Sequence, residues 1–421
     1  MGNLTKIFKS IKTSKKGNLT VLLSMIFVSL VFMVFVFIKY SAHLATVSYA
    51  NDVLELAGRA ILSEYHSDLK NTYGIFAFEG FEKETKSDLE FYIDKSFNNK
   101  EKSKGINMIR PKLQELAVDF QDFALMDVEN FREEIVSAYP YIKTKPAMGY
   151  GKISYSKGEL INERIKKELP SYCLGTKGYD LTNPIKVTTE IWNKGLSTLT
   201  SETMMNEYIL NMCNCNTENK SPVYTFFQNE IEYILYGYCK DEQNKAEFLK
   251  QFKTIRFTLN SAHIYADTEK RNKVLTAAET ITPGPEAVVT AAILAELWAA
   301  METSNDKELL IAGKGVALKK DTFSWAIDFQ SVLDKFLQGS SDSRDGKYIE
   351  PEKESDMGYK EYLKIFLCCQ EDEVKLIRLM DLIQLNIQGN FDDSFRIKDC
   401  YLGLMYEAKI NGQKYKYIQN Y

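Results

Sequence analysis

The stretch Leu19–Ile38 reads LTVLLSMIFVSLVFMVFVFI, and the rest of the chain is organised around it. It contains no charged residue, no proline and no glycine. A helix needs about 20 such residues to cross the hydrocarbon core of a bilayer. The pattern therefore predicts a transmembrane helix over residues 18–38. Because the apolar core of a cleaved secretory signal has only about 7 to 15 residues, we expect a retained anchor.

The charges that precede the apolar stretch predict its direction. Residues 1–17 hold five lysines and no acidic residue, a local charge of +5. The whole chain carries −4, so everything after Gly17 sums to −4 − 5 = −9. Lysines beside a first span hold that end in the cytoplasm. We therefore expect a single-pass protein of the cell membrane, with a cytoplasmic N-terminus and an acidic extracytoplasmic bulk. An acidic bulk argues against nucleic acid as a partner, and against broad adhesion to anionic lipid.

Residues 39–72 continue the helical pattern outside the membrane. Between Lys39 and Thr72 there is no proline and only one glycine, Gly58. Apolar residues at steps of three and four give this extension one apolar face. Two occupants fit that face: the chain's own extracytoplasmic domain, or a neighbouring copy or partner helix. The residues proposed for contact with a partner are Val47, Ala50, Leu54, Ala57 and Ile61.

Residues 73–421 predict an extracytoplasmic α+β domain. We expect the long amphipathic helix to pack on a mixed sheet, with a mainly helical part over about residues 241–338. Expected strands or extended segments cover residues 75–78, 114–126 and 229–235, and a closing hairpin turns at Asn411-Gly412. Expected helices cover residues 81–97, 128–139 before Pro140, 199–212, 358–369 and 372–387. Three further helices are expected between residue 241 and about residue 313, with breaks near Asp267 and Thr282. The apolar run 287–301 contains Glu296 and is short for a span, so it predicts a buried helix.

Signals for catalysis or metal binding are sparse. The chain has only three histidines, His43, His66 and His263, and neither His43 nor His66 has a spaced acidic partner that would suggest a metal site. Cys213-Asn214-Cys215 has no second pair at zinc spacing. The loop 341–352 carries serines where a calcium loop needs carboxylates or amides. We therefore nominate no catalytic, cofactor-binding or metal-binding residue and no cofactor, and expect a non-enzymatic protein. The seven cysteines are odd in number and sparse, which predicts buried free thiols.

Short motifs in a fixed order resemble a known family. They begin with Lys16-Gly17-Asn18-Leu19-Thr20-Val21 before the apolar run. The later ones are Ser63-Glu64-Tyr65, Tyr73-Gly74-Ile75-Phe76, Asn206 to Leu210, Glu230 to Gly237 and Met380 to Ile383. Together the chain resembles TadE/TadG-like proteins of tight-adherence (Flp-type) pilus systems, and most of it is similar to uncharacterised single-span proteins of clostridia-like bacteria.

The resemblance implies a pseudopilin-like or accessory component of a pilus assembly or secretion system, with protein partners in that assembly. It also implies processing after Gly17 and a glutamate five residues later. Leu22 stands at that place and has no charge to pair with a neighbour's amino terminus, which argues against incorporation as a standard pilin and against cleavage. An uncleaved accessory protein is compatible with this departure. Two alternatives stay open. The first is a membrane-tethered extracellular binding module, and the second, with weaker support, is an anchored hydrolase of the cell envelope.

Overall fold

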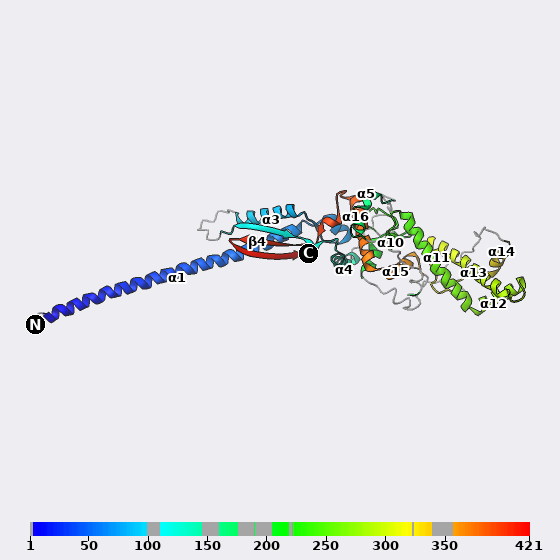
Figure 1. The fold of residues 1–421 in the computed structure, drawn as a ribbon, viewed down its shortest axis with the longest axis horizontal. Coiled ribbons are helices and arrows are strands. Elements are labelled where there is room, and N and C mark those ends of the chain that lie inside the picture. Colours follow the sequence, from blue (N-terminus) through cyan, green and yellow to red (C-terminus); the bar gives the residue numbers. More distant parts are fainter. Residues whose placement is uncertain are drawn as a thin grey trace. The chain divides into compact units, whose positions relative to one another are not determined.

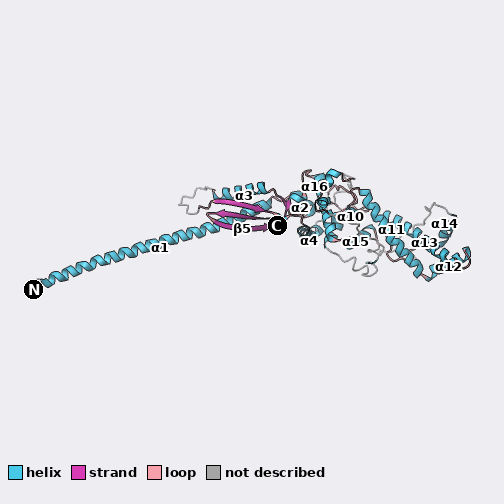
Figure 2. Cartoon of the chain, viewed as in Figure 1, coloured by secondary structure: helices cyan, strands magenta, loops and turns pink. Residues whose placement is uncertain are grey.

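The computed structural model describes residues 3–98, 110–144, 160–175, 189, 204–218, 221, 223–321, 324–338 and 357–421 (Figure 1). The chain forms two compact units. Unit 1 comprises residues 1–65, 78–123 and 401–421, and unit 2 comprises residues 66–77 and 124–400. The strands of the three-stranded sheet belong to unit 1, whereas unit 2 is built mainly of helices (Figure 2). The chain is thus α+β, as expected from the sequence.

Unit 1 consists of two helices and a small sheet. Helix α1 (Asn3–Ser63) packs against α3 (Glu82–Phe97) and against the sheet of β2 (Leu113–Asp119), β4 (Gly403–Ile410) and β5 (Gln413–Asn420). The strand order is β2-β4-β5, and both pairings are antiparallel. The prediction of a mixed sheet is therefore wrong for this sheet. Strand β1 (Phe78–Glu79) pairs with β3 (Cys400–Tyr401), and a short 3-10 turn, η1, covers Gln121–Phe123.

The closing hairpin is confirmed at the predicted place. Asn411 and Gly412 connect β4 to β5 with φ angles of 49° and 83°. A two-residue turn with positive φ at both positions matches the right-handed twist of the flanking strands, and Asn-Gly is the sequence that adopts it most readily. The strand preceding the turn alternates buried and less buried side chains, so its buried face points toward the core of unit 1.

The core of unit 1 lies between the second half of α1, α3 and the sheet. Apolar side chains of all these elements are buried together, among them Ala50, Leu54, Leu89, Leu116 and Leu404. Tyr406 Oη donates a hydrogen bond to the Leu54 carbonyl oxygen (2.6 Å), which ties β4 to α1. The second half of α1 is therefore the central element of unit 1.

The long helix ends earlier than predicted. It stops at Ser63 rather than Thr72, and a separate helix, α2 (Ser67–Tyr73), follows. His66 has extended backbone angles, and its Nδ1 accepts a hydrogen bond from the Leu69 amide (3.2 Å), so it caps α2. Helix α2 ends at Gly74 (φ 74°), two residues after the predicted end of the helical pattern at Thr72. The predicted strand 75–78 is reduced to the two residues of β1, Phe78–Glu79.

In unit 2, the next helix after α2 is longer than predicted. Helix α4 (Val128–Thr144) contains Pro140, so the prediction that this proline ends the helix is wrong. Short helices α5 (Glu163–Lys166) and α6 (Pro170–Cys173) follow, then α9 (Met204–Met212) and α10 (Glu230–Tyr236). The strand predicted over residues 229–235 is thus a helix, in which all seven residues are buried. The alternation of polar and apolar residues misled the prediction because Glu230 and Glu232 point inward.

The remaining helices of unit 2 follow the sequence pattern closely, except that the sequence predicts no separate helix over residues 329–338. They are α11 (Asp241–Ala266), α12 (Thr268–Ile281), α13 (Ala287–Ile311), α14 (Phe329–Gln338), α15 (Tyr359–Cys369) and α16 (Asp372–Asn390), before the turn η2 (Ile397–Asp399). Asp267 marks the first predicted break and caps α12 by accepting from the Glu269 and Lys270 amides. The inner face of α13 packs around Trp298 in a cluster with α11, α12 and α14, whereas Val288, Val289 and Ile293 on the same helix are exposed. The prediction of a buried helix is therefore confirmed for one face only. The candidate calcium loop 341–352 lies outside the described residues.

Candidate functional site

Residues 19–38 of α1 present an apolar surface on all sides. Between Leu19 and Ile38 the large apolar side chains are 41% to 71% exposed. The hydroxyl groups of Ser24 and Ser29 donate hydrogen bonds to the Val21 and Ile26 carbonyl oxygens at 2.8 Å, so they are satisfied within the helix. A helix that is apolar all round needs an apolar environment. This stretch has the length and composition of a membrane anchor or a signal sequence.

Polar and aromatic residues begin where the apolar stretch ends. Lys39 and Tyr40 are exposed, and the Lys39 ammonium lies 5.6 Å from the centre of the Phe35 ring. Lysine and tyrosine place an apolar body beside lipid and a polar end in the headgroup layer. The residues flanking the stretch therefore suit the boundary between lipid and water.

The second half of α1 has a different environment. Ala50, Leu54, Ala57 and Ile61 are buried in the core of unit 1, and Val47 is half-buried. Of the two occupants that the sequence left open for this face, the structure places the chain's own domain there. A partner helix would therefore have to contact other residues.

Unit 2 contains a group of buried carboxylates around α10. Glu230 accepts hydrogen bonds from the Asn214 amide (2.8 Å) and from Asn386 Nδ2 (2.7 Å). Burial raises the pKa of Glu230 to about 8, although both hydrogen bonds act in the opposite direction. Because both carboxylate oxygens have partners, this side chain fixes the segment after α9 and helix α16 against α10.

Glu232 lies on the same helix, α10, two residues after Glu230. Its Oε1 accepts from Tyr359 Oη (2.7 Å) and from the Asn216 amide (3.2 Å). Its Oε2 has no hydrogen-bond partner among the described residues. Burial raises the pKa of Glu232 to about 7, and a buried carboxylate oxygen without a partner favours the protonated carboxyl group. Nearby Asp241, whose pKa burial also raises, accepts from the Gln228 and Asn229 amides.

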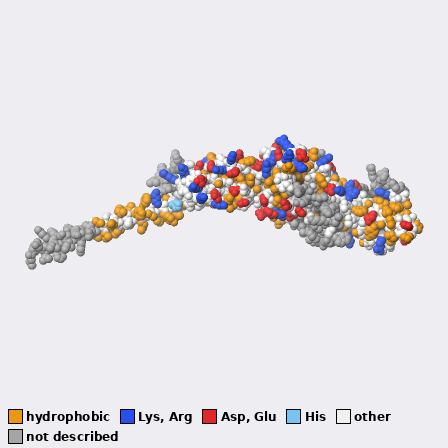
Figure 3. Space-filling model, in the orientation of Figure 1, with side chains coloured by type: hydrophobic (Ala, Val, Ile, Leu, Met, Phe, Trp, Pro, Cys, Tyr) orange, Lys and Arg blue, Asp and Glu red, His pale blue; other side chains and the backbone are white. Residues whose placement is uncertain are grey.

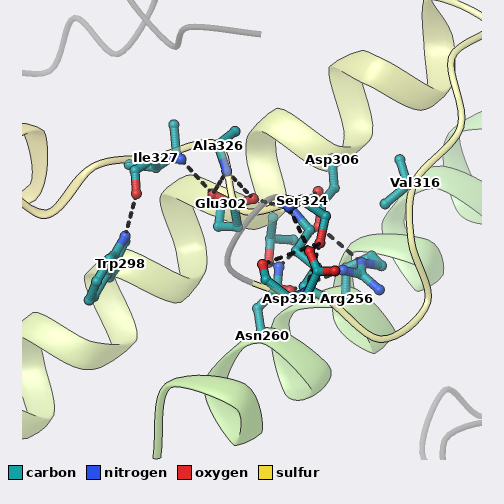
Figure 4. A network of polar contacts seen from close by, with 12 residues as sticks. Arg256, Asn260, Trp298, Glu302, Asp306, Val316, Asp321, Ser324, Ala326 and Ile327 are labelled. Atoms are coloured by element: carbon teal, nitrogen blue, oxygen red, sulfur yellow. Dashed lines mark hydrogen bonds and ion pairs between the residues drawn. The ribbon is translucent and has the colours of Figure 1, made fainter. Parts of the chain in front are cut away.

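A second buried group joins α11 to α13 (Figure 4). The Arg256 guanidinium donates through Nε to Asp306 Oδ2 (2.9 Å), and both side chains are fully buried. Arg256 also donates to the Leu318 carbonyl oxygen (2.8 Å) and to Asn260 Oδ1 (3.0 Å). Lys320 reaches the other oxygen of Asp306 at 2.5 Å. Burial raises the pKa of Asp306, but the Arg256 and Lys320 cations outweigh this, so the pKa is lowered overall.

Glu302 extends this group toward the segment after α13. Its carboxylate pairs with Lys320 and accepts from the Ile327 amide (2.8 Å). Trp298 Nε1 donates to the Ile327 carbonyl oxygen (2.8 Å), as Figure 4 shows. Together these contacts hold the segment after α13 against helices α11 and α13. The charged side chains involved are Arg256, Glu302, Asp306 and Lys320. Removal of one member would leave buried charge without compensation, so we interpret the group as structural.

The histidines and cysteines discussed from the sequence occupy separate places. His43 is exposed on α1, His66 caps α2, and His263 on α11 stacks on Trp325 with ring centres 5.2 Å apart. All seven cysteines are free thiols, which confirms that the chain has no disulfide framework; four are buried, and Cys173 is exposed. Burial raises the pKa of the Cys213 and Cys215 thiols, so neither is an activated nucleophile.

Sequence reasoning missed the buried carboxylates and the Arg256–Asp306 pair. Acidic residues are frequent in this chain, and spacing alone does not distinguish a buried glutamate from a solvated one. One available signal was Gly237, which follows α10 directly and has φ 67°. A glycine just after the last apolar residue is typical of a helix C-terminus and not of a strand.

Together these features define a class: a mainly helical chain of two units, with one exposed apolar helix near its N-terminus. Within this class, the chain belongs to a family of unknown function, DUF5702, which matches residues 151–412 and thus more than half of the chain. No curated protein matches the chain, and no solved structure matches it.

Proposed function

We propose that the protein is a non-enzymatic, membrane-anchored accessory component of a tight-adherence-type pilus assembly or secretion system. Helix α1 carries this proposal. One uninterrupted helix has an exposed apolar stretch over residues 19–38 and, further along, residues 50–62 that lie in the core of unit 1. Such a helix connects a bilayer rigidly to a folded unit outside it, as an assembly component at the membrane surface requires. The family resemblance of residues 16–21 supports the same assignment.

Leu22 and the lysines before Gly17 support an accessory role rather than a polymerising one. A pilin subunit needs a charge inside its apolar segment to pair with the amino terminus of a neighbour. Leu22 is exposed on α1 and offers none. We therefore expect the lysine-rich N-terminus to be retained, with α1 as a permanent anchor.

Gene deletion in the native host tests the proposal. We expect fewer surface fibres by electron microscopy, restored by the full chain. A chain starting at Tyr40 behind a cleavable secretion signal should not restore them, because it lacks the anchor. Unchanged fibres after deletion would contradict the assembly role. The intact mass of the membrane-extracted protein tests retention: a mature terminus at Asn18 would show processing and contradict the accessory form.

A further inference from the structure

The tip of the β4–β5 hairpin lies level with the end of the apolar stretch of α1. Tyr417 Oη donates to Asn51 Oδ1 (2.6 Å), and Tyr421 Oη donates to the Leu62 carbonyl oxygen (2.7 Å). Strand β5 and α1 therefore run in the same direction. Between these two hydrogen bonds the strand advances four residues, about 13 Å, and the helix advances eleven residues, about 16 Å. Because the two lengths are similar, the strand axis and the helix axis are nearly parallel.

The same rises per residue give the position of the hairpin tip along the axis of α1. Gly412 precedes Tyr417 by five residues, about 17 Å of strand. Ile38 precedes Asn51 by thirteen residues, about 20 Å of helix. The tip thus ends within a few ångströms of the level of Ile38. The headgroup layer on each side of a bilayer is about 5 to 8 Å thick, so the tip lies at its depth if α1 crosses the membrane. Figure 1 shows the hairpin turn on the side of unit 1 from which the apolar part of α1 extends.

Two further segments of unit 1 reach this end. The Lys112 amide donates to Asn411 Oδ1 (3.1 Å), and Asn411 Nδ2 donates to the Arg110 carbonyl oxygen (3.2 Å), so the start of β2 lies at the hairpin tip. Tyr49 Oη donates to the Ser96 carbonyl oxygen (2.7 Å), which places the C-terminal end of α3 beside the first turns of α1 outside the apolar stretch.

This end of unit 1 is basic although the chain after Gly17 is acidic. Among the described residues, this end carries six basic side chains and two acidic ones, Asp94 and Glu115. Glu115 pairs with Lys409 at 2.8 Å, and Lys409 is the one basic side chain of the six that is only partly exposed. The six are Lys39, Lys95, Arg110, Lys112, Lys409 and Lys414. Blue side chains lie around the point where the apolar helix enters the unit in Figure 3. We name these six residues the basic end.

We propose that the basic end binds the phosphate groups of anionic lipids in the bilayer that α1 enters. This inference rests on the anchoring part of the proposed function. The anchor keeps the basic end at headgroup depth permanently, so no separate association step is needed. Juxtamembrane lysines attract anionic lipid over roughly one Debye length, about 8 to 10 Å, and the hairpin tip lies within that range. The contact would orient unit 1 on the membrane and restrict rotation of the chain about α1.

The test uses the full chain in vesicles of neutral phosphatidylcholine and in vesicles with about one third phosphatidylglycerol, which carry the surface charge that the basic end needs. Co-flotation with both kinds first measures anchoring. An amine-reactive reagent is then applied, and the labelling rates of single lysines are read by peptide mass spectrometry. We expect Lys112 and Lys414 to react about fivefold more slowly in the anionic vesicles, and this protection to disappear in about 1 M salt, where the Debye length is near 3 Å.

Two lysines at the opposite end of α3 provide the control. Lys83 and Lys86 are exposed there and should react equally fast in both vesicles. The double variant K112Q/K414Q should reduce the protection of Lys95, whereas K83Q/K86Q should leave it unchanged. Equal labelling of Lys112 and Lys414 in both vesicles, after flotation has shown anchoring, would overturn the lipid contact alone. Failure to float with either vesicle would overturn the anchor and the lipid contact with it.

Discussion

Buried carboxylates of unit 2 differ in pKa according to their partners. Asp306 is buried beside Arg256 and Lys320, and these cations lower its pKa. Glu230 is equally buried, but among the described residues no Lys or Arg pairs with it, and its pKa rises to about 8. Burial disfavours a charge that has no counter-charge nearby. The first carboxylate is therefore stable as an ion, and the second is stable as a neutral acid.

This difference predicts how the stability of unit 2 depends on pH. The folded-state pKa of Glu230 lies above the ordinary value of 4.5, so the folded chain binds the proton more tightly than the unfolded chain. Its contribution is fully present below about pH 4.5 and is lost as the pH rises through about 8. We expect the free energy of unfolding to decrease between these values by at most about 4 kcal/mol. Urea denaturation followed by tryptophan fluorescence would measure it.

The E230Q variant isolates this effect, because glutamine does not titrate. Its free energy of unfolding should vary less with pH over the same range. The matched control is E242Q, since Glu242 is exposed on the neighbouring helix α11 and should keep the wild-type slope. A slope that is the same in E230Q and the wild-type chain would show that Glu230 is not the titrating group.

At the scale of elements, a single glycine lets α1 and the sheet approach each other. A Cβ atom at Gly58 would meet Gln419 and would lie 2.8 Å from Tyr406 Oη. The glutamine side chain can move, but Tyr406 is buried and hydrogen-bonded to the Leu54 carbonyl oxygen. We therefore expect Gly58→Ala to destabilise unit 1 by about 1 to 3 kcal/mol, despite the higher helix propensity of alanine.

Hydrogen exchange of the β4 and β5 amides would measure this loss as faster exchange. Ser48→Ala is the control, because Ser48 is exposed on the same helix and should change stability by less than about 0.5 kcal/mol. Unchanged exchange in Gly58→Ala would mean that α1 and the sheet are less closely packed than the structure shows.

The elements also show what sequence patterns can predict. Helices α11, α12, α13, α15 and α16 and the Asn411-Gly412 hairpin were predictable because caps, breaks and periodicity are local features. The end of α1 was not predictable, because it depends on contacts of His66. The His66 side chain caps the next helix, α2, and its amide donates to the carbonyl oxygen of Ala77, eleven residues further along the chain. Helix α10 was misassigned since burial of Glu230 and Glu232 depends on partners such as Asn386 and Tyr359, far away in the chain.

At the scale of the whole molecule, the exposed apolar surface and the residues of the folded core occupy different parts of α1. The exposed apolar stretch ends at Ile38, and the first fully buried residue of the helix is Ala50. The segment between them contributes little to the core. The need for lipid or detergent and the ability to fold should therefore be separable by truncation.

We expect a chain that starts at Tyr40 to remain folded and soluble without detergent, whereas the full chain requires it. The truncated chain keeps Ala50 to Leu62, which supply the contribution of α1 to the core of unit 1. Gel filtration would measure its size, and hydrogen exchange would compare its β4 and β5 amides with those of the full chain in detergent. The full-length variant Val28→Asp is the control for the apolar stretch: a carboxylate at the middle of a span costs about 2.5 to 3.5 kcal/mol, so membrane attachment should weaken while unit 1 stays protected. If the truncated chain aggregated or lost protection in β4 and β5, residues 1–39 would be needed for folding and not only for attachment.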